Sequence, residues 1–130
     1  MEEIFATGPL TGLVNNAAGN FISRTEDLSP NAFNAIKAAL ITYSGQLSQA
    51  WGPEGIRVNA VSPGWTWSNI MVQLTQNNRA KTDKVAAPFH LLKRTGNPEE
   101  VAEAVAFLLS DAAAIIRGQS INVDGGDTPY

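Results

Sequence analysis

Few side chains in this sequence combine type and spacing in a way that suggests acid–base or metal chemistry. His90 is the only histidine and cysteine is absent, so the usual ligand sets of a zinc site cannot form, and we expect no metal. As a general base His90 would need a partner that orients its ring, and the sequence identifies none. Lys37 borders an apolar stripe, as either a functional ammonium or a lysine lying along the edge of a buried face. Tyr43 lies on that stripe, and we expect it in the core.

A first turn carries amide side chains suited to a polar ligand. Asn15, Asn16 and Gly19 follow the apolar pair Leu13–Val14. A short apolar run that ends in small and polar residues is typical of a buried strand in a parallel sheet. The three residues either line a ligand or simply end the strand.

A second turn follows a run rich in β-branched residues, and it holds Pro63, Gly64 and Thr66. Trp65 and Trp67 flank the threonine. The two indoles could stack on a planar ligand, but we favour their burial in the core or in a subunit contact.

Strands and helices alternate around these turns. We expect strands at Leu13–Val14, 56–61 and 119–124, helices at 30–50 and from Pro98 to about 109, a short helix at 69–76 and a mobile polar loop at 77–87. This order predicts an α/β fold, a small three-stranded parallel sheet with flanking helices.

Apolar periodicity and capping residues set the limits of the two longer helices. The first has Pro30 in its first turn, an apolar stripe, and a stop signal at 51–53. That stripe consists of Phe33, Ile36, Leu40, Tyr43, Leu47 and Ala50. The second helix follows Asn97, with Glu100 placed for a capping box. Its expected buried residues are Val101, Ala104, Val105, Leu108 and Leu109.

Composition narrows the class of protein. The chain has 130 residues, 44% of them hydrophobic, and a net charge of −3. We expect one domain over 1–130, and no nucleic-acid surface, because no basic stripe is present. The acidic start and the lack of a long apolar stretch predict neither a secretory signal nor a membrane span, and hence a cytoplasmic protein.

Four segments resemble the short-chain dehydrogenase/reductase family. They are Leu13–Gly19, which resembles the family's Asn-Asn-Ala-Gly strand end, Gly55–Gly64, Arg94–Ala102 and Gly118–Gly126. They occur in the family's order, and residues 15–33 are most similar to its enoyl- and dienoyl-CoA reductase branch. The resemblance implies a partial Rossmann fold and an NAD- or NADP-dependent oxidoreductase. It also implies contacts to the cofactor from Asn15, Asn16, Gly19, Pro63, Gly64 and Thr66, with Lys37 in the active site.

The sequence departs from the family in two losses. The strand and turn that carry the glycine-rich fingerprint have no counterpart, which puts cofactor binding in doubt. The chain also passes from the start of one family helix at Phe33 into the middle of the next at Lys37. The strand and the catalytic serine between them are missing.

A third departure concerns the family's Tyr-x-x-x-Lys pattern. Phe33 stands where the tyrosine belongs, and phenylalanine cannot donate a proton. Lys37 is then the one catalytic residue that the resemblance leaves.

Two hypotheses follow. The chain is either an NAD(P)-dependent oxidoreductase whose site is rebuilt in an oligomer, or a non-catalytic, truncated or recombined Rossmann-like protein. Because open strand edges invite pairing, we expect a homodimer or larger assembly, through the edge at Leu13–Val14 or through the stripe of the 30–50 helix. The sequence names no small-molecule substrate.

Overall fold

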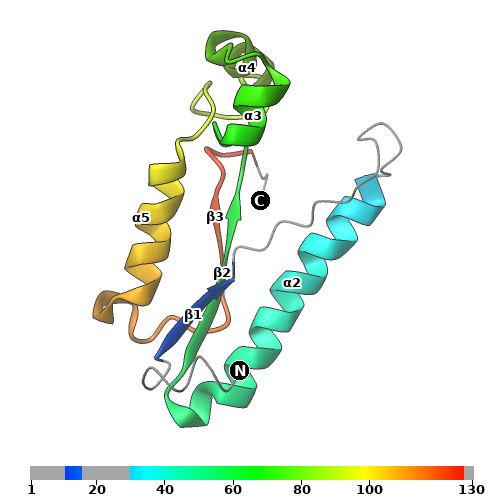
Figure 1. The fold of residues 1–130 in the computed structure, drawn as a ribbon. Helices are drawn as coiled ribbons and strands as arrows, with labels where there is room; N and C mark the ends of the chain where they lie inside the picture. Colours follow the sequence, from blue (N-terminus) through cyan, green and yellow to red (C-terminus); the bar gives the residue numbers. More distant parts are fainter. Residues whose placement is uncertain (1–10, 16–29, 128–130) are drawn as a thin grey trace. The chain divides into compact units, whose positions relative to one another are not determined.

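The structure of the chain, a computed structural model, describes residues 11–15 and 30–127, with side chains for all of these except 15 and 30–37. In chain order the elements are β1 (Gly12–Asn15), α2 (Pro30–Trp51), η1 (Gly52–Glu54), β2 (Arg57–Pro63), α3 (Asn69–Leu74), α4 (Arg79–Ala86), α5 (Pro98–Leu109), η2 (Asp111–Ala113) and β3 (Ser120–Val123) (Figure 1). The predicted turn at Asn16–Gly19 lies outside the described residues.

The three strands form one sheet in the order β1-β2-β3, which confirms the prediction of a small three-stranded parallel sheet with flanking helices. β1 pairs with β2 in parallel, from Gly12 opposite Arg57 to Asn15 opposite Ala60. On the other side of β2, the Ala60 N–H donates to the Gln119 carbonyl at 2.8 Å. β2 is therefore the central strand.

The described residues group into two compact units, which are described separately. The first holds the described residues up to Ala60 together with Leu109–Ser120, and the second holds Val61–Leu108 together with the described residues from Ile121 onward. β2 and β3 each continue from the first unit into the second.

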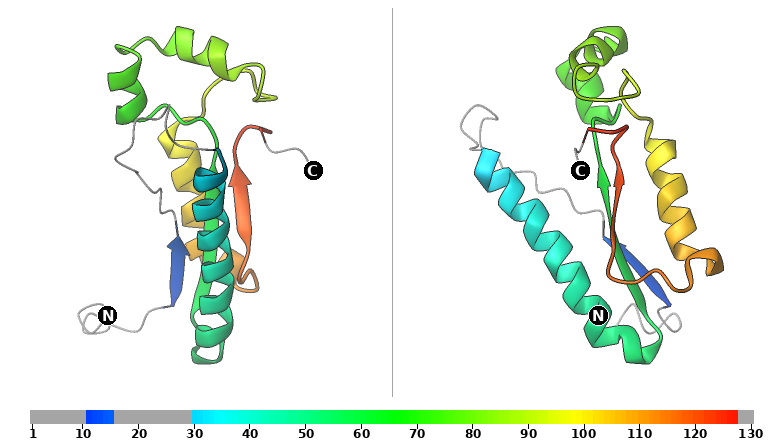
Figure 2. Two further views of the ribbon diagram at one scale, coloured as in Figure 1. Left: turned by 90° about the vertical axis from the view of Figure 1, so that its right-hand side faces the viewer. Right: turned by 180° about the vertical axis from the view of Figure 1, so that it is seen from behind.

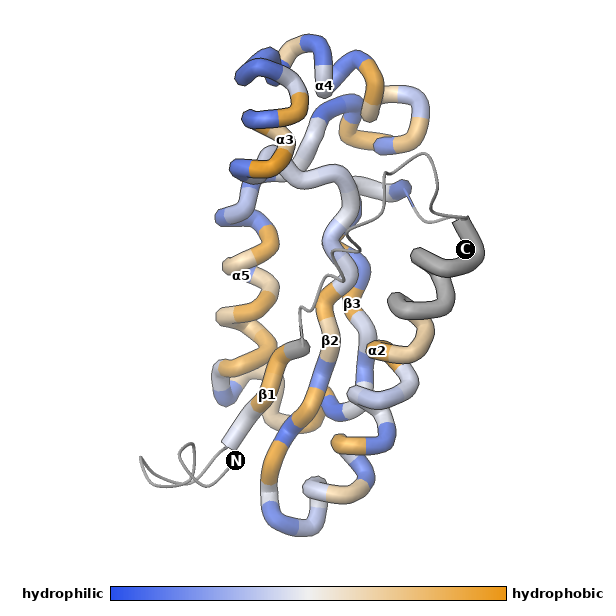
Figure 3. Tube along the Cα trace, turned by 45° about the vertical axis from the view of Figure 1, so that its right-hand side comes forward, coloured by the Kyte–Doolittle hydropathy of each residue, from blue (hydrophilic) through white to orange (hydrophobic). Residues whose placement is uncertain are grey.

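In the first unit, hydrophobic and hydrophilic residues alternate along the start of β2 (Figure 3). Both kinds are buried. Arg57 donates to the carbonyls of Leu109, Ser110 and Ala113 at 3.0–3.3 Å. Asn59 donates to the Ile116 carbonyl and accepts from a main-chain N–H. Buried polar groups are tolerated here because main-chain partners satisfy them.

The apolar stripe of α2 is not its buried face. Tyr43, which the stripe placed in the core, is 58% exposed, whereas Ser44 and Ser48 are buried. A Cβ added at Gly118 would lie only 3.4 Å from the Ser48 Cβ, so the helix approaches the turn before β3 through small residues. Close approach of the main chain, which a hydrophobicity pattern does not register, decides which face is covered.

The stop signals of α2 are confirmed. The helix ends at Trp51, and η1 with Gly55 at φ 83° reverses the chain into β2 (Figure 2). Glycine suits this position because a side chain there would be strained.

In the second unit the expected mobile loop at 77–87 is wrong, because residues 79–86 form α4. The Asn78 side chain caps this helix by accepting from the Lys81 N–H at 3.0 Å. The short helix predicted at 69–76 is present as α3. In α5, Val101 and Leu108 are buried as expected, but Leu109 is about half exposed.

Candidate functional site

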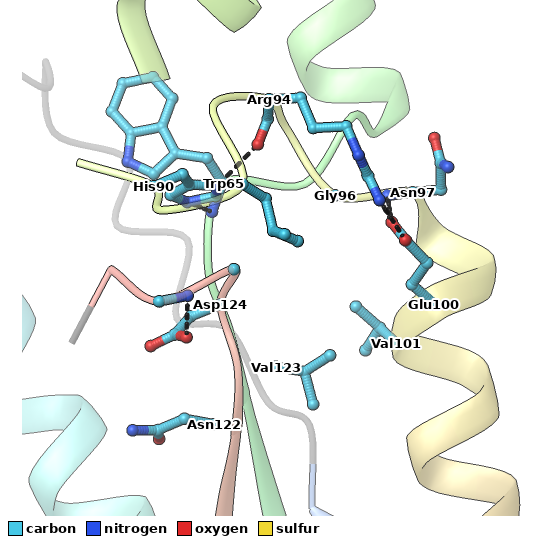
Figure 4. Close-up of a pocket in the computed structure, with 13 residues that line it drawn as sticks. Trp65, His90, Arg94, Gly96, Asn97, Glu100, Val101, Asn122, Val123 and Asp124 are labelled. Carbon is cyan, nitrogen blue, oxygen red and sulfur yellow. Dashed lines mark hydrogen bonds and ion pairs between the residues drawn. The ribbon is translucent and has the colours of Figure 1, made fainter. Parts of the chain in front are cut away.

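A cleft of about 260 Å³ lies in the second unit, where the end of β3, the loop before α5 and the start of α5 meet (Figure 4). Its walls include aromatic, charged and glycine residues. The lining residues are Trp65, His90, Leu92, Arg94, Gly96, Asn97, Glu100, Val101, Asn122, Val123, Asp124, Gly125 and Gly126.

His90 is 2% exposed, and both of its ring nitrogens are occupied. The Trp65 N–H donates to Nε2 at 3.2 Å, and Nδ1 lies 2.8 Å from the Arg94 carbonyl. Because a carbonyl can only accept, Nδ1 carries the proton and the ring is neutral. The sequence named no orienting partner for His90. The structure gives two main-chain partners, which leave neither nitrogen available to a substrate.

Arg94 and Glu100 form a bidentate pair at 2.8 and 2.6 Å on one wall of the cleft. Hydrogen bonds from Arg94, and a further one from the Asn97 N–H, hold the pKa of Glu100 at about 2, and the pair raises the pKa of Arg94. The Asn97 N–H donates to Glu100 at 2.7 Å, which confirms the predicted capping box at the start of α5. The two charges are therefore held by each other.

Thr95 is fully buried beside this pair. Its N–H and its hydroxyl donate to the same oxygen of Asp83 in α4, at 2.8 and 2.6 Å. Burial raises the pKa of Asp83, but these two bonds, with Arg79 and Arg94 nearby, outweigh burial and leave the pKa below its usual value. The segment from Arg94 to Asn97 thus ties α4 and α5 to the end of β2.

Thr66 sits beside this segment. The Gly96 N–H donates to the Trp65 carbonyl and the Trp67 N–H donates to the Gly96 carbonyl, both at 2.8 Å. In such a bridge the N–H and C=O of Thr66 itself point away from Gly96. Within the described residues neither main-chain group of Thr66 has a hydrogen-bond partner, and its hydroxyl donates to the Gly64 carbonyl at 3.1 Å.

Gly64 marks a close approach of two main chains. Its N–H donates to the Val123 carbonyl at 3.2 Å, and a Cβ added to it would lie 2.7 Å from the Asp124 Cα. Asp124 accepts from the Gly126 N–H at 2.9 Å, which is the structural turn expected there. Only glycine fits between β2 and β3 at this point.

The two tryptophans of the second turn stack within the protein. Trp65 is 38% exposed and lies parallel to Phe89, with ring centroids 6.4 Å apart. The Arg79 guanidinium lies over the Trp67 ring at 5.9 Å.

The residues predicted from sequence fall into three groups. Pro63, Gly64 and Thr66 follow one another at the end of β2 in the second unit. Asn15 ends β1 and Lys37 lies in α2, both in the first unit, and their side chains are not among those described. Asn16 and Gly19 lie outside the described residues. The sequence missed the Asp83–Thr95 and Arg94–Glu100 contacts, since these partners are six or twelve positions apart and match no helical or strand spacing.

Within the part of the chain that the structure describes, no three histidine, cysteine, aspartate or glutamate residues gather in a way that could hold a metal ion. No helix in that part is long and apolar enough to cross a membrane.

Known proteins match most of the chain. A family model described as enoyl-(acyl carrier protein) reductase matches residues 22–128. A probable 2,4-dienoyl-CoA reductase from Bacillus subtilis is 30% identical over 183 residues, which cover 99% of this chain and 71% of the relative. That match is longer than the 130-residue chain, so the relative has residues inside the matched region that this chain lacks. An internal loss was expected from the sequence.

Other matches cover less of the relative. The 3beta-hydroxysteroid dehydrogenase 2 of Eggerthella lenta is 35% identical over 76% of this chain, which spans 38% of that protein. An NADPH-bound short chain oxidoreductase from Pseudomonas aeruginosa, described as having an atypical catalytic center, has a TM-score of 0.72 and 27% identity. That likeness covers 77% of this chain and 40% of the solved one.

Proposed function

The chain belongs to the short-chain dehydrogenase/reductase family, and we propose that it binds the nicotinamide end of NAD(H) or NADP(H) at the end of β2, as part of an oxidoreductase. The observation that carries this proposal is Thr66, whose main-chain N–H and C=O have no partner among the described residues. The family resemblance brings Pro63, Gly64 and Thr66 to the nicotinamide amide.

The groups at Thr66 fit a carboxamide. A carboxamide offers one acceptor oxygen and two N–H donors, and Thr66 presents one main-chain donor and one main-chain acceptor. The Gly96 bridge fixes the direction of both groups, so little conformational freedom would be lost on binding. When bound, the nicotinamide supplies hydride transfer to or from a carbonyl or enoyl carbon. Thr66 would orient the ring, and Lys37 and Asn15 would contact the ribose side of the site.

Proton transfer has no assigned residue in this proposal. Phe33 replaces the family's tyrosine, and His90 has both nitrogens engaged by main chain. The charged groups of the cleft, Arg94 and Glu100, are paired with each other. We propose that a second copy of the chain completes the site.

Self-association is the part of the proposal that centrifugation tests. β1 lies at one end of the strand order, and Ile41 and Tyr43 of α2 are exposed, which supports pairing through either element. Sedimentation at several concentrations should show a dimer or larger species, and a monomer at all concentrations would contradict a site shared between copies. A cytoplasmic location belongs to the same proposal and is supported by the absence of cysteine.

Titration with NADH and with NADPH, followed by nicotinamide fluorescence and thermal shift, tests cofactor binding, because a ligand of the native state raises its melting temperature. The 3-acetylpyridine analogue keeps the ring acceptor and lacks the amide N–H groups. If the carboxamide meets Thr66, the analogue should bind roughly fivefold to tenfold more weakly, the factor for one hydrogen bond.

Two variants locate the site. Thr66→Pro removes the main-chain donor and should abolish the preference for the carboxamide, whereas Thr66→Val keeps both main-chain groups and should retain it. Lys37→Ala should weaken affinity for both cofactor forms. Absence of any shift at millimolar NADH and NADPH would reject the oxidoreductase and leave the non-catalytic interpretation.

A further inference from the structure

We infer that His90 is a positioning residue that holds the Trp65–Thr66 segment only while its ring is neutral, so that acidification releases this segment. The effect on cofactor affinity rests on the function proposed above, but the pH-dependent contact does not. The inference is based on the geometry of the ring, which joins two separate stretches of main chain at one point (Figure 4).

His90 joins the residue before Thr66 to the segment before α5. The Trp65 N–H donates to Nε2, and the protonated Nδ1 donates to the Arg94 carbonyl. The only other printed contacts between these segments are the two main-chain bonds of Gly96. Of these three connections within the described residues, the imidazole is the one made by a side chain, and hence the one that can gain a proton.

A second proton removes one connection. The imidazolium carries N–H on both nitrogens and has no acceptor, so the Trp65 N–H would face another N–H at 3.2 Å. A ring flip offers no escape, because it would place carbon atoms opposite both partners. A buried donor without an acceptor is costly, and a shift of the segment toward solvent is the available response.

The surroundings restrict movement of the ring itself. His90 is almost fully buried, and the space at Gly125 is so tight that a Cβ there would lie 3.1 Å from Nδ1. The charged side chains that share the cleft are Arg94, Glu100 and Asp124. Arg94 and Glu100 hold each other, and Asp124 is engaged with the Gly126 N–H. None of these printed contacts offers the imidazolium an acceptor at Nε2.

Hydrogen exchange at the Trp65 amide, measured by NMR in the cofactor-free protein as a protection factor, tests the inference directly. Between about pH 7.5 and pH 5.5, where histidine side chains titrate, protection should fall roughly fivefold or more. The Ala60 amide, bonded to the Gln119 carbonyl far along the strand, is the internal reference and should not change.

His90→Gln is the decisive variant. Its side-chain oxygen can accept from the Trp65 N–H and does not titrate, so protection at residue 65 should become independent of pH. His90→Phe offers no acceptor and should show low protection at both pH values. If that variant fails to fold, the comparison of wild type with His90→Gln still decides.

Constant protection in the wild type across this pH range would overturn the inference, as would an equal loss in His90→Gln. The same two proteins are titrated with NADP⁺ at both pH values. Affinity should fall at low pH in the wild type alone. If NADP⁺ binds neither protein at either pH, the proposed function fails, and amide exchange still decides the role of His90.

Discussion

The contact between Thr95 and Asp83 permits a test with a calculable size. Thr95→Val removes the hydroxyl that donates to the carboxylate at 2.6 Å, and it leaves the 2.8 Å bond from the main-chain N–H in place. A hydrogen bond to a charged acceptor contributes about 1.5–3 kcal/mol. The added methyl group, in a position that is fully buried, recovers less than about 1 kcal/mol. The variant should therefore lose about 1–2 kcal/mol of unfolding free energy.

Urea unfolding followed by far-UV circular dichroism measures this loss. With a slope of about 1–1.5 kcal/mol per molar urea, the midpoint should fall by about 1 M. Thr82→Val is the matched control, because Thr82 is also buried but donates to the Asn78 carbonyl within α4. It should cost much less, since a hydroxyl that bonds back along a helix adds little stability.

A double-mutant cycle separates the contact from other effects of each substitution. Asp83→Asn combined with Thr95→Val should reveal a coupling of about 1 kcal/mol or more, because the two side chains share one hydrogen bond. The reasoning is refuted if Thr95→Val costs no more than Thr82→Val, or if the two substitutions are additive.

Three further predictions concern the same fold. The pKa of Glu100 is held at about 2, below its usual 4.5, so the stability from its pair with Arg94 is complete above about pH 4.5 and is lost as pH falls toward 2; Glu100→Gln should flatten the urea midpoint over that range. Arg57→Met leaves three carbonyls without their donor and should cost about 3 kcal/mol or more in thermal or urea unfolding, while Arg57→Lys should cost less. Gly64→Ala forces a Cβ against the Asp124 main chain and should lower the melting temperature by several degrees, with no loss if β3 can move aside.

Local sequence signals predicted the elements well. The stop at residues 51–53, the capping box between Asn97 and Glu100 and the three strands all depend on residues within a few positions of one another. Such signals act through one helix turn or one strand, so they can be read without knowing the rest of the fold.

Predictions failed where a distant contact decides the outcome. Tyr43 lies on the apolar stripe, yet the covered face of α2 carries Ser44 and Ser48, because the Gly118 turn comes close to it. The polar stretch expected to be a mobile loop became α4, a helix capped by Asn78 and connected to Thr95 through Asp83. The roles of His90 and Arg94 were invisible for the same reason, since their partners are set by the folded chain.

These distant contacts bear on how recognition and chemistry divide in the proposed site. The contacts that fix Thr66 come from Gly96, His90 and Gly64, and all of them lie within the second unit. Lys37 belongs to the first unit. If the proposal is correct, substitutions around Thr66 should change discrimination between the carboxamide and its acetyl analogue without changing the dependence on Lys37. Lys37→Ala should lower affinity for both forms by the same factor, because an ammonium on the ribose does not distinguish between them. A variant of either residue that altered both quantities together would mean that the two units act as one site, and the nicotinamide contact could not then be assigned to Thr66 alone.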